Sequence, residues 1–344
     1  MDYIWEADDL FLGLDLGGTN AVLGLVNGCG KVLAEATLPT SSFPTVQAFV
    51  EAAVSAAGQL ADALGGRQRI KAMGIGAPNG NFFRATMVHA VNIQWARGEE
   101  IPLASLFENH LKVPVVLTND ANAAALGEQA YGAARGMENF IVLTLGTGVG
   151  AGIVVNGQLV YGVDGMAGEL GHFTVRRDGG RPCGCGRNGC LETYCSATGV
   201  ARTAVEWLET ETAPSILRER DPKSITSLDV ARAAQDGDEL ALRILARTGE
   251  ILGQACADFA TFCSPEAFIF AGGLANAGAL LLKPAELSYD AHVMAVYRGK
   301  ARFLPTELGS ARAALLGAAL LGRNQLEGGA QSDLQKAEKD KMRR

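Results

Sequence analysis

The sequence has no excess of basic residues, no long apolar run and no basic leader at its N-terminus. Its formal net charge is −7 and its isoelectric point is about 5.3. An acidic chain is repelled by nucleic-acid phosphates and by anionic lipids, which argues against both partners. No apolar run approaches the roughly 20 residues of a membrane-spanning helix, and Met1–Asp9 is acidic, unlike a signal peptide. We therefore expect a cytoplasmic protein with neither a nucleic acid nor a membrane as partner.

Two common nucleotide-binding motifs are also missing. No G-x-x-x-x-G-K-[ST] run occurs, which excludes a P-loop protein. The first glycine turn leads into a predicted strand rather than a helix, so it is not a Rossmann dinucleotide motif. The seven cysteines are an odd number, which fits poorly with a full set of disulfides. In a reducing compartment they are read first as metal ligands or packing residues.

What the chain does have is the composition of a globular protein long enough for two domains. It contains 344 residues, 48% of them hydrophobic and 19% charged. Apolar runs predict strands, and apolar residues at helical spacing predict helices. The predicted strands are 11–14, 21–26, 31–38, 70–76, 113–118, 140–145, 151–155 and 266–271, and the predicted helices are 46–64, 121–129, 196–208, 240–263 and 310–321. Their alternation predicts an α/β fold.

A weak internal repeat divides the chain. Residues 11–26 and 140–155 each read as a strand, a glycine turn and a second strand. A repeated supersecondary unit of this kind predicts two α/β halves that begin in the same way.

Three glycine-rich turns lie at strand ends, at Asp15–Thr19, Gly146–Gly150 and Gly272-Gly273. Glycine lets the backbone approach a ligand closely, and a turn then directs several N–H groups at phosphate oxygens. One such turn is often only a hairpin. Three turns in one chain, two of them in matching places, favour a phosphate-binding role, and Asp15 would add a carboxylate for a magnesium-bound water.

A polar run, Thr118-Asn119-Asp120-Ala121-Asn122, follows a predicted strand. In open α/β sheets, ligands bind at the carboxyl ends of the strands. Asp120 can therefore accept a proton from a substrate hydroxyl while Asn119 binds a neighbouring hydroxyl. The alternative, that Asp120 only caps the following helix, is equally compatible with the sequence.

One histidine and three cysteines form the sharpest pattern. His172 precedes the run Cys183-Gly184-Cys185, and Cys190 follows it closely. These are the four tetrahedral ligands that zinc prefers, and glycines between them allow sharp turns. Because all four positions are filled, the predicted zinc is structural and not catalytic. Two acids flank the loop, Glu169 and Glu192. Carboxylates there are suited to sugar hydroxyls, although they also read as ordinary surface acids.

Together these motifs resemble those of the ROK family of bacterial sugar kinases and sugar-responsive repressors. The resemblance covers about 11–321 and is most specific between Gly168 and Glu192, where E-x-G-H is followed by C-x-C-G-x-x-G-C-x-E. It implies an actin-like (ribonuclease H-like) α/β fold of two domains with the active site in the interdomain cleft. The expected parts are an N-terminal domain over 1–134, a C-terminal domain with the zinc loop over 135–309, a final helix over 310–322 that returns to the N-terminal domain, and a disordered tail over 323–344.

The resemblance also implies roles for single residues. Asp120 matches the catalytic base, and His172 matches both a zinc ligand and a sugar-binding residue. The implied sugar-binding residues are Asn79, Asn92, Asn119, Asp120, Glu169, His172 and Glu192. The residues implied for ATP and magnesium are Asp15, Gly17, Gly18, Thr19, Gly146, Thr147, Gly148, Gly272 and Gly273, and those for zinc are His172, Cys183, Cys185 and Cys190. The family's P-N-L triplet reads Val91-Asn92-Ile93 here.

The implied activity is ATP-dependent phosphorylation of glucose at its 6-hydroxyl by a homodimer that uses ATP, Mg²⁺ and a structural Zn²⁺. Kinases for N-acetylglucosamine, N-acetylmannosamine, fructose or allose are the alternatives within the class. A repressor would need a helix-turn-helix domain ahead of the first glycine turn, where only fourteen residues precede Asp15. A catalytically inactive sugar-binding protein is disfavoured because Asp15, Asp120 and the three turns are intact.

Overall fold

The computed structural model describes residues 9–326. The chain forms two compact units. Among these residues, the first unit contains 9–135, 159–167 and 311–326, and the second contains 136–158 and 168–310. Each unit is built on a five-stranded sheet, and each is described in turn.

The sheet of the first unit has the strand order β3-β2-β1-β4-β8. Its strands are β1 (Leu10–Leu16), β2 (Asn20–Asn27), β3 (Val32–Pro39), β4 (Ile70–Ala77) and β8 (Val115–Asn119). β1 pairs antiparallel with β2 and parallel with β4, and β4 pairs parallel with β8. A small antiparallel sheet joins β5 (Gly80–Asn81), β6 (Thr86–Val88) and β7 (Glu100–Ile101). The parallel strands bring their carboxyl ends to one edge of the larger sheet.

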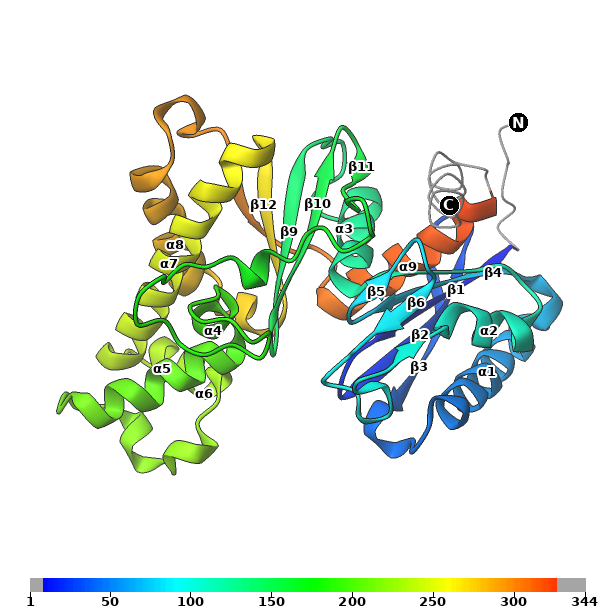
Figure 1. Ribbon diagram of the computed structural model, residues 1–344, viewed down its shortest axis with the longest axis horizontal. Helices are drawn as coiled ribbons and strands as arrows, with labels where there is room; N and C mark the ends of the chain where they lie inside the picture. The colour runs from blue at the N-terminus through cyan, green and yellow to red at the C-terminus, as the bar shows by residue number, and fades with distance from the viewer. Residues whose placement is uncertain (1–8, 327–344) are drawn as a thin grey trace. The chain divides into compact units, whose positions relative to one another are not determined.

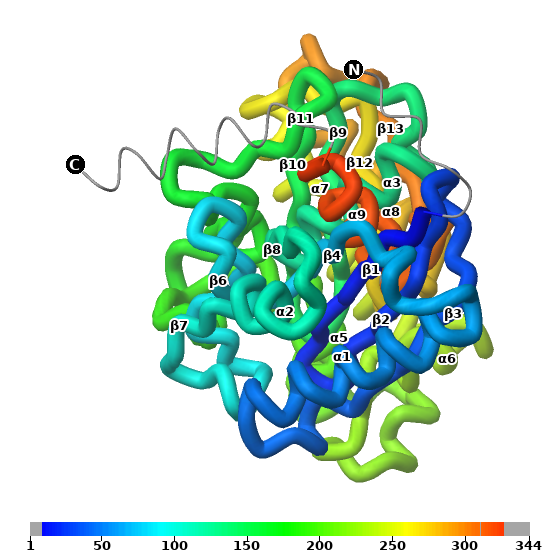
Figure 2. The backbone as a smooth tube through the Cα atoms, turned by 90° about the vertical axis from the view of Figure 1, so that its right-hand side faces the viewer, coloured from blue at the N-terminus to red at the C-terminus, as the bar shows by residue number. Residues whose placement is uncertain are grey.

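Helices cover both faces of this sheet (Figures 1 and 2). α1 (Val46–Asp62) and α2 (Leu103–Leu111) pack on one face, where Leu12 and Leu14 share a buried cluster with Phe49 and Phe107. Thr45 caps α1 by accepting a hydrogen bond from the N–H of Ala48, as its position before the apolar run predicts. α3 (Asp120–Tyr131) and α9 (Ser310–Leu326) lie on the opposite face.

α9 approaches the sheet so closely that glycine is required beneath it. A Cβ at Gly74 on β4 would lie 1.8 Å from the carbonyl oxygen of Ala318, and one at Gly13 on β1 would lie 2.3 Å from that of Leu315. No side chain fits in such a gap. The last of the described helices therefore packs directly on strands β1 and β4.

The second unit repeats the opening pattern of the first. Its sheet has the order β11-β10-β9-β12-β13, and β9 pairs antiparallel with β10 and parallel with β12, as β1 does with β2 and β4. The strands are β9 (Phe140–Leu145), β10 (Val149–Val155), β11 (Gln158–Leu159), β12 (Ala267–Ala271) and β13 (Arg302–Pro305). The helices are α4 (Glu192–Cys195), α5 (Ala197–Thr210), α6 (Ser227–Gln235), α7 (Glu239–Cys263) and α8 (Ala279–His292). The predicted repeat is thus present in the topology.

The structure differs from the sequence-based division at one segment. Residues 159–167 belong with the first unit, although the chain around them belongs to the second. The ring of Tyr161 stacks on Phe82 with centroids 4.2 Å apart, and the side-chain amide of Asn81 donates to the carbonyl oxygen of Asp164 at 2.7 Å. These long-range contacts leave no local pattern. The expected tail begins inside α9, which runs to Leu326, and its remainder lies outside the described residues.

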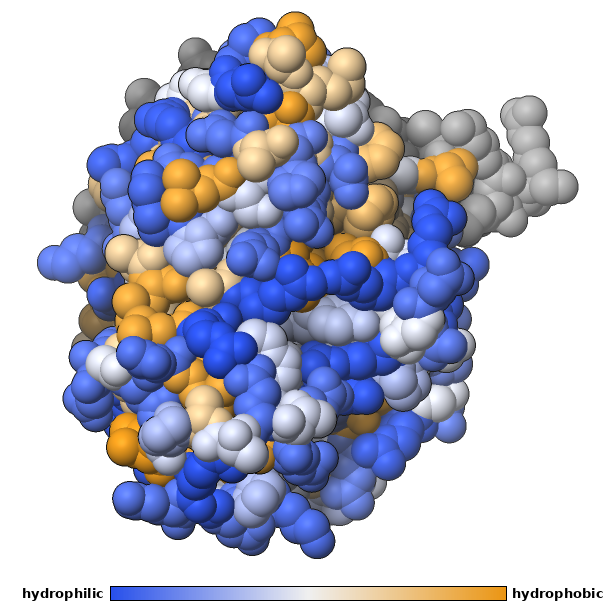
Figure 3. Space-filling model, turned by 90° about the vertical axis from the view of Figure 1, so that its left-hand side faces the viewer, coloured by the Kyte–Doolittle hydropathy of each residue, from blue (hydrophilic) through white to orange (hydrophobic). Residues whose placement is uncertain are grey.

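Polar side chains predominate on the face drawn in Figure 3, with hydrophobic ones in scattered patches. Among the described residues, no helix is both long and apolar enough to cross a membrane.

Candidate active site and metal centre

The strand register brings two acidic positions of the first unit to the same edge of its sheet. Asp15 on β1 pairs with Gly76 on β4, and Gly76 pairs with Thr118 on β8. Asp120 follows two residues later, at the first position of α3. Asp15 and Asp120 therefore both lie where the parallel strands end, which is the edge at which α/β sheets bind ligands.

Asn119, rather than Asp120, is the N-cap of α3. Its side-chain oxygen accepts from the N–H of Ala121 at 2.8 Å, and one oxygen of Asp120 accepts from the same N–H at 2.9 Å. The capping role that the sequence left open for Asp120 thus falls mainly to its neighbour. The amide NH₂ of Asn119 can donate to a ligand, and the carboxylate of Asp120 can accept further hydrogen bonds.

Burial raises the pKa of both carboxyl groups and so makes them weaker acids. It raises the pKa of Asp15 to about 7, with a further contribution from the charge of Asp120. Burial also raises the pKa of Asp120, although the backbone N–H of Ala121 acts in the opposite direction. Acids with perturbed pKa values at the edge of a sheet make this edge a candidate functional site.

The first glycine turn lies against the loop that carries Asn92. A Cβ at Gly18 would lie 3.0 Å from both the Cβ and the carbonyl oxygen of Asn92. Thr40 secures the turn by donating its hydroxyl to the carbonyl oxygen of Gly17 at 2.9 Å. Asn79 follows β4 with a left-handed φ of 50°, and its amide donates to the carbonyl oxygen of His89 at 3.4 Å.

In the second unit, two glycine turns are neighbours at the end of β9. Gly146–Gly148 links β9 to β10, and the N–H of Gly146 donates to the carbonyl oxygen of Gly148 at 3.0 Å. Gly272 has a φ of 96°, and a Cβ there would lie 2.3 Å from the carbonyl oxygen of Leu145. The parallel pairing of Ala271 with Thr144 puts both turns at one sheet edge, so the predicted phosphate-side and adenosine-side turns come together.

The segment Cys183–Cys190, which carries the three predicted thiol ligands and is called the metal loop below, also lies near this edge. One carboxyl oxygen of Glu192 accepts from the N–H of Val149 at 3.0 Å, and the other lies 3.8 Å from the Sγ of Cys183. Glu169 begins the short 3₁₀ turn Leu170–His172 and accepts from the N–H of His172 through its backbone oxygen at 3.0 Å. The Glu192 carboxylate therefore lies beside the metal ligand Cys183, and the Glu169 backbone is bonded to that of the ligand His172.

The four predicted metal ligands gather at one point. The ligand atoms of His172, Cys183, Cys185 and Cys190 lie within 4.8 Å of one another. The Sγ of Cys183 is 3.6 Å from Nδ1 of His172, and the Sγ atoms of Cys185 and Cys190 are also 3.6 Å apart. Tetrahedral zinc separates sulfur and nitrogen ligands by roughly 3.5 to 3.8 Å. The donor set and its spacing fit a zinc ion.

Sequence reasoning missed one residue beside this loop, Arg181. Arg181 contacts the loop, α4 and α5 at once. It lies among other arginines of a polar stretch, a composition typical of solvent-exposed charge, and no motif distinguishes it.

The repeated sheets with paired glycine turns define an α/β protein of the actin-like class. A model of the ROK family matches residues 11–325, and the chain belongs to that family. The resemblance given by the motifs is thereby confirmed.

Its relatives include curated glucokinases. The glucokinase of Halalkalibacterium halodurans is 37% identical over 310 residues, which are 88% of this chain and 92% of that protein. The glucokinase of Streptomyces coelicolor is also 37% identical, over 91% of this chain and 98% of the relative.

Solved structures to which the chain is similar also belong to the ROK family. A ROK family glucokinase from Streptomyces griseus, in complex with glucose and AMPPNP, is 35% identical with a TM-score of 0.75 and covers 92% of this chain and 99% of its own. A ROK hexokinase from Thermus thermophilus is 30% identical with a TM-score of 0.76, over 93% of this chain and 100% of its own.

Proposed function

We propose that the protein is an ATP-dependent sugar kinase that transfers the terminal phosphoryl group of ATP to the 6-hydroxyl of glucose. The observation that carries the proposal is the position of Asp120 at the sheet edge, with a raised pKa and with Asp15 on the same edge. The similarity to glucokinases over nearly the whole chain supports glucose as the sugar.

Asp120 acts as the general base. Its carboxylate accepts the proton of the 6-hydroxyl as the oxygen attacks the phosphoryl group. A raised pKa suits this task, because a base with a pKa near the working pH is ionised and still basic enough to take the proton. The N–H of Ala121 holds one carboxyl oxygen and leaves the other for the hydroxyl.

The other sugar hydroxyls are bound by asparagine, glutamate and histidine side chains. Asn79, Asn92 and Asn119 supply amide groups, and Glu169 and Glu192 supply carboxylates. His172 joins the two sites: its Nδ1 faces the thiols, and Nε2, on the far side of the ring, is the atom that a sugar hydroxyl would meet. Charged acceptors make the stronger hydrogen bonds, so the two glutamates contribute most to sugar affinity.

Backbone N–H groups of the glycine turns bind the nucleotide. Gly17, Gly18 and Thr19 contact the phosphates, as do Gly146, Thr147 and Gly148, and Gly272 and Gly273 lie on the adenosine side. Phosphoryl transfer depends mainly on positioning and electrostatic stabilisation. Mg²⁺, when bound, neutralises the phosphate charge, and Asp15 offers it the carboxylate oxygen that this ion prefers.

Asp120→Asn tests the assignment. The amide oxygen still accepts from Ala121, so the helix cap survives while the base is lost. We expect turnover to fall about a hundredfold or more with glucose affinity retained, measured by an ADP-coupled assay and by calorimetry. Asp62→Asn, a change on the exposed end of α1, is the control. Undiminished turnover in Asp120→Asn would reject the role, and a hexose panel that excludes glucose would reject the substrate.

We further propose that His172, Cys183, Cys185 and Cys190 bind one structural Zn²⁺, which cross-links the loop when bound. Elemental analysis should find about one zinc per chain, and removal by a chelator should lower the melting temperature. Cys29→Ser, a change at an exposed cysteine outside the cluster, should keep the zinc. Fully active protein without metal would refute this assignment.

The family resemblance supports two coarser expectations, a homodimer and a place in cytoplasmic glucose metabolism. Light scattering after gel filtration tests the first, since the monomer mass is 35.9 kDa. A mass near this value at micromolar concentration would contradict it.

A further inference from the structure

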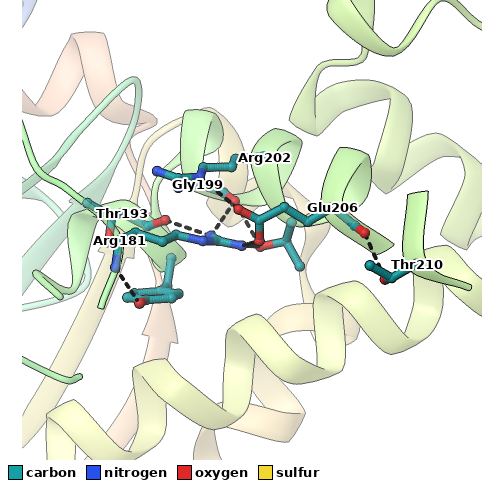
Figure 4. Close-up of polar contacts among 8 residues, drawn as sticks. Arg181, Thr193, Gly199, Arg202, Glu206 and Thr210 are labelled. Atoms are coloured by element: carbon teal, nitrogen blue, oxygen red, sulfur yellow. Dashed lines mark hydrogen bonds and ion pairs between the residues drawn. The ribbon is translucent and has the colours of Figure 1, made fainter. Parts of the chain in front are cut away.

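Arg181 is the most heavily bonded arginine near the metal loop, and the proposed chemistry does not use it. Its side chain is only 10% exposed. Its guanidinium donates to the carbonyl oxygens of Thr193 at 2.8 Å and of Gly199 at 3.3 Å, and to the hydroxyl of Thr203 at 3.0 Å. It also forms an ion pair with Glu206. Figure 4 shows the side chain reaching from the loop to α5.

The backbone of Arg181 closes the metal loop at its base. Its carbonyl oxygen accepts from the N–H of Gly189 at 2.8 Å, and its N–H donates to the hydroxyl of Tyr194 at 3.0 Å. The guanidinium carbon lies 4.7 Å from the centroid of the Tyr194 ring, within cation–π range. One residue therefore joins the start of the loop to its end and to the first turn of α4.

Glu192 directly precedes two residues that Arg181 contacts, Thr193 and Tyr194. It follows the last metal ligand, Cys190, and precedes Thr193, whose carbonyl oxygen accepts from Arg181. Its own carboxylate is held by the N–H of Val149. The carboxylate of Glu192 is thus held by the glycine turn, and the backbone of the next residue is held by Arg181.

Burying an arginine costs desolvation free energy that its partners must offset. Here Glu206 remains the ionised partner. Burial by itself would raise the pKa of Glu206, but hydrogen bonds from Arg181 and Arg202 outweigh it and hold the pKa below its ordinary value. A planar guanidinium can satisfy four acceptors in fixed directions, whereas a lysine ammonium has three donors on a flexible stem.

We propose that Arg181 is a positioning residue for the sugar site: its guanidinium ties the metal loop to α4 and α5 and thereby fixes Glu192 for binding sugar, in addition to any restraint from the metal. The inference rests on the proposed kinase function. A purely structural role would change the melting temperature without a selective effect on sugar.

Arg181→Met is the direct test, with Arg243→Met as its matched control. Arg243 also pairs with a glutamate, Glu211, and also lies over an aromatic ring, Trp207, at 5.1 Å, but it is 53% exposed. In the zinc-loaded protein we expect Arg181→Met to raise the KM and the Kd for glucose about tenfold or more and the KM for ATP less than twofold. It should also release zinc faster to a chelating dye. Arg243→Met should change neither.

Arg181→Lys keeps the positive charge but not the planar guanidinium, so it distinguishes an effect on the position of Glu192 from a failure to fold. If Arg181→Met does not fold, the lysine variant carries the test, and an intermediate rise in glucose Kd supports the proposal. An unchanged glucose Kd in whichever variant folds overturns it, as does an equal rise in the constants for glucose and ATP. If the wild-type protein neither binds nor phosphorylates glucose, the proposed function fails first, which is a separate result.

Discussion

The carboxylate of Glu192 accepts a 3.0 Å hydrogen bond from the backbone N–H of Val149. This bond joins the end of the metal loop to the first residue of β10, directly after the glycine turn. A Cβ at Gly148 would lie 2.3 Å from the same carboxyl oxygen. The proposed sugar-binding and phosphate-binding segments of the second unit are therefore in direct contact.

Glu192→Gln should weaken glucose binding without unfolding the protein. The amide oxygen still accepts from Val149, so the bond to the turn survives. What is lost is the charge on the acceptor: a hydrogen bond to a charged group contributes about 1.5 to 3 kcal/mol, against about 0.5 to 1.5 kcal/mol for a neutral one. We expect the glucose Kd to rise about tenfold by calorimetry. Glu209→Gln, an exposed change on α5, is the control, and an unaltered Kd in Glu192→Gln would exclude Glu192 from the sugar site.

The pH dependence of activity should show an acidic limb near neutrality. Asp15 must be ionised to serve Mg²⁺, and burial raises its pKa to about 7. Asp120 must be ionised to act as base, and its pKa is also raised by burial. The profile of kcat/KM reports groups of the free enzyme, so it should fall as the pH decreases through about 7. A limb confined to the range of an ordinary carboxyl, about pH 4, would contradict this.

The stability of the ligand-free protein should decrease as the pH rises. Asp15 ionises near 3.8 when unfolded and near 7 when folded, so between these values the folded state binds the extra proton. Its contribution is complete below about pH 4 and is lost as the pH passes 7. The loss from Asp15 between pH 5 and pH 8 is on the order of 2 kcal/mol.

Asp15→Asn should remove the part of this dependence that comes from Asp15 and leave any part from Asp120, whose pKa burial also raises. The variant should melt at a higher temperature than the wild-type protein at pH 8, with a smaller difference at pH 5, measured by calorimetry on zinc-loaded, nucleotide-free protein. Asp62→Asn should follow the wild-type curve. If wild-type protein and Asp15→Asn show parallel curves, Asp15 is not the buried acid described here.

Gly74→Ala should loosen the packing of α9 on the first sheet. The added Cβ would lie 1.8 Å from the carbonyl oxygen of Ala318, and overpacking of this kind costs about 1 to 3 kcal/mol or more. We expect a lower melting temperature. In Gly146→Ala a Cβ would meet nothing within 4 Å, so its effect on melting should be small. Equal melting of both variants would show that α9 can shift away from β4 at little cost.

Much of the fold could be predicted because its signals are local. β9 at Phe140–Leu145 matches the predicted strand, and α1 begins at the residue after the predicted cap, Thr45. Other elements were not predicted. Pro284 lies inside α8 and argues against a helix from sequence. The side-chain hydrogen bonds of Arg181 join residues 12 to 25 positions apart, which no pattern of spacing marks.

The sequence by itself determined the chemistry available to this protein. It contains the residue types of a thiolate–imidazole metal site, the acids Asp15 and Asp120 and the glycine turns, since each of these is a short motif. Tertiary structure decided what those residues do. The strand register put Asp15 and Asp120 at one edge, burial raised their pKa values, and folding of the loop put Glu192 against Val149. Burial and long-range contact depend on how distant segments pack, and a local pattern carries no record of that.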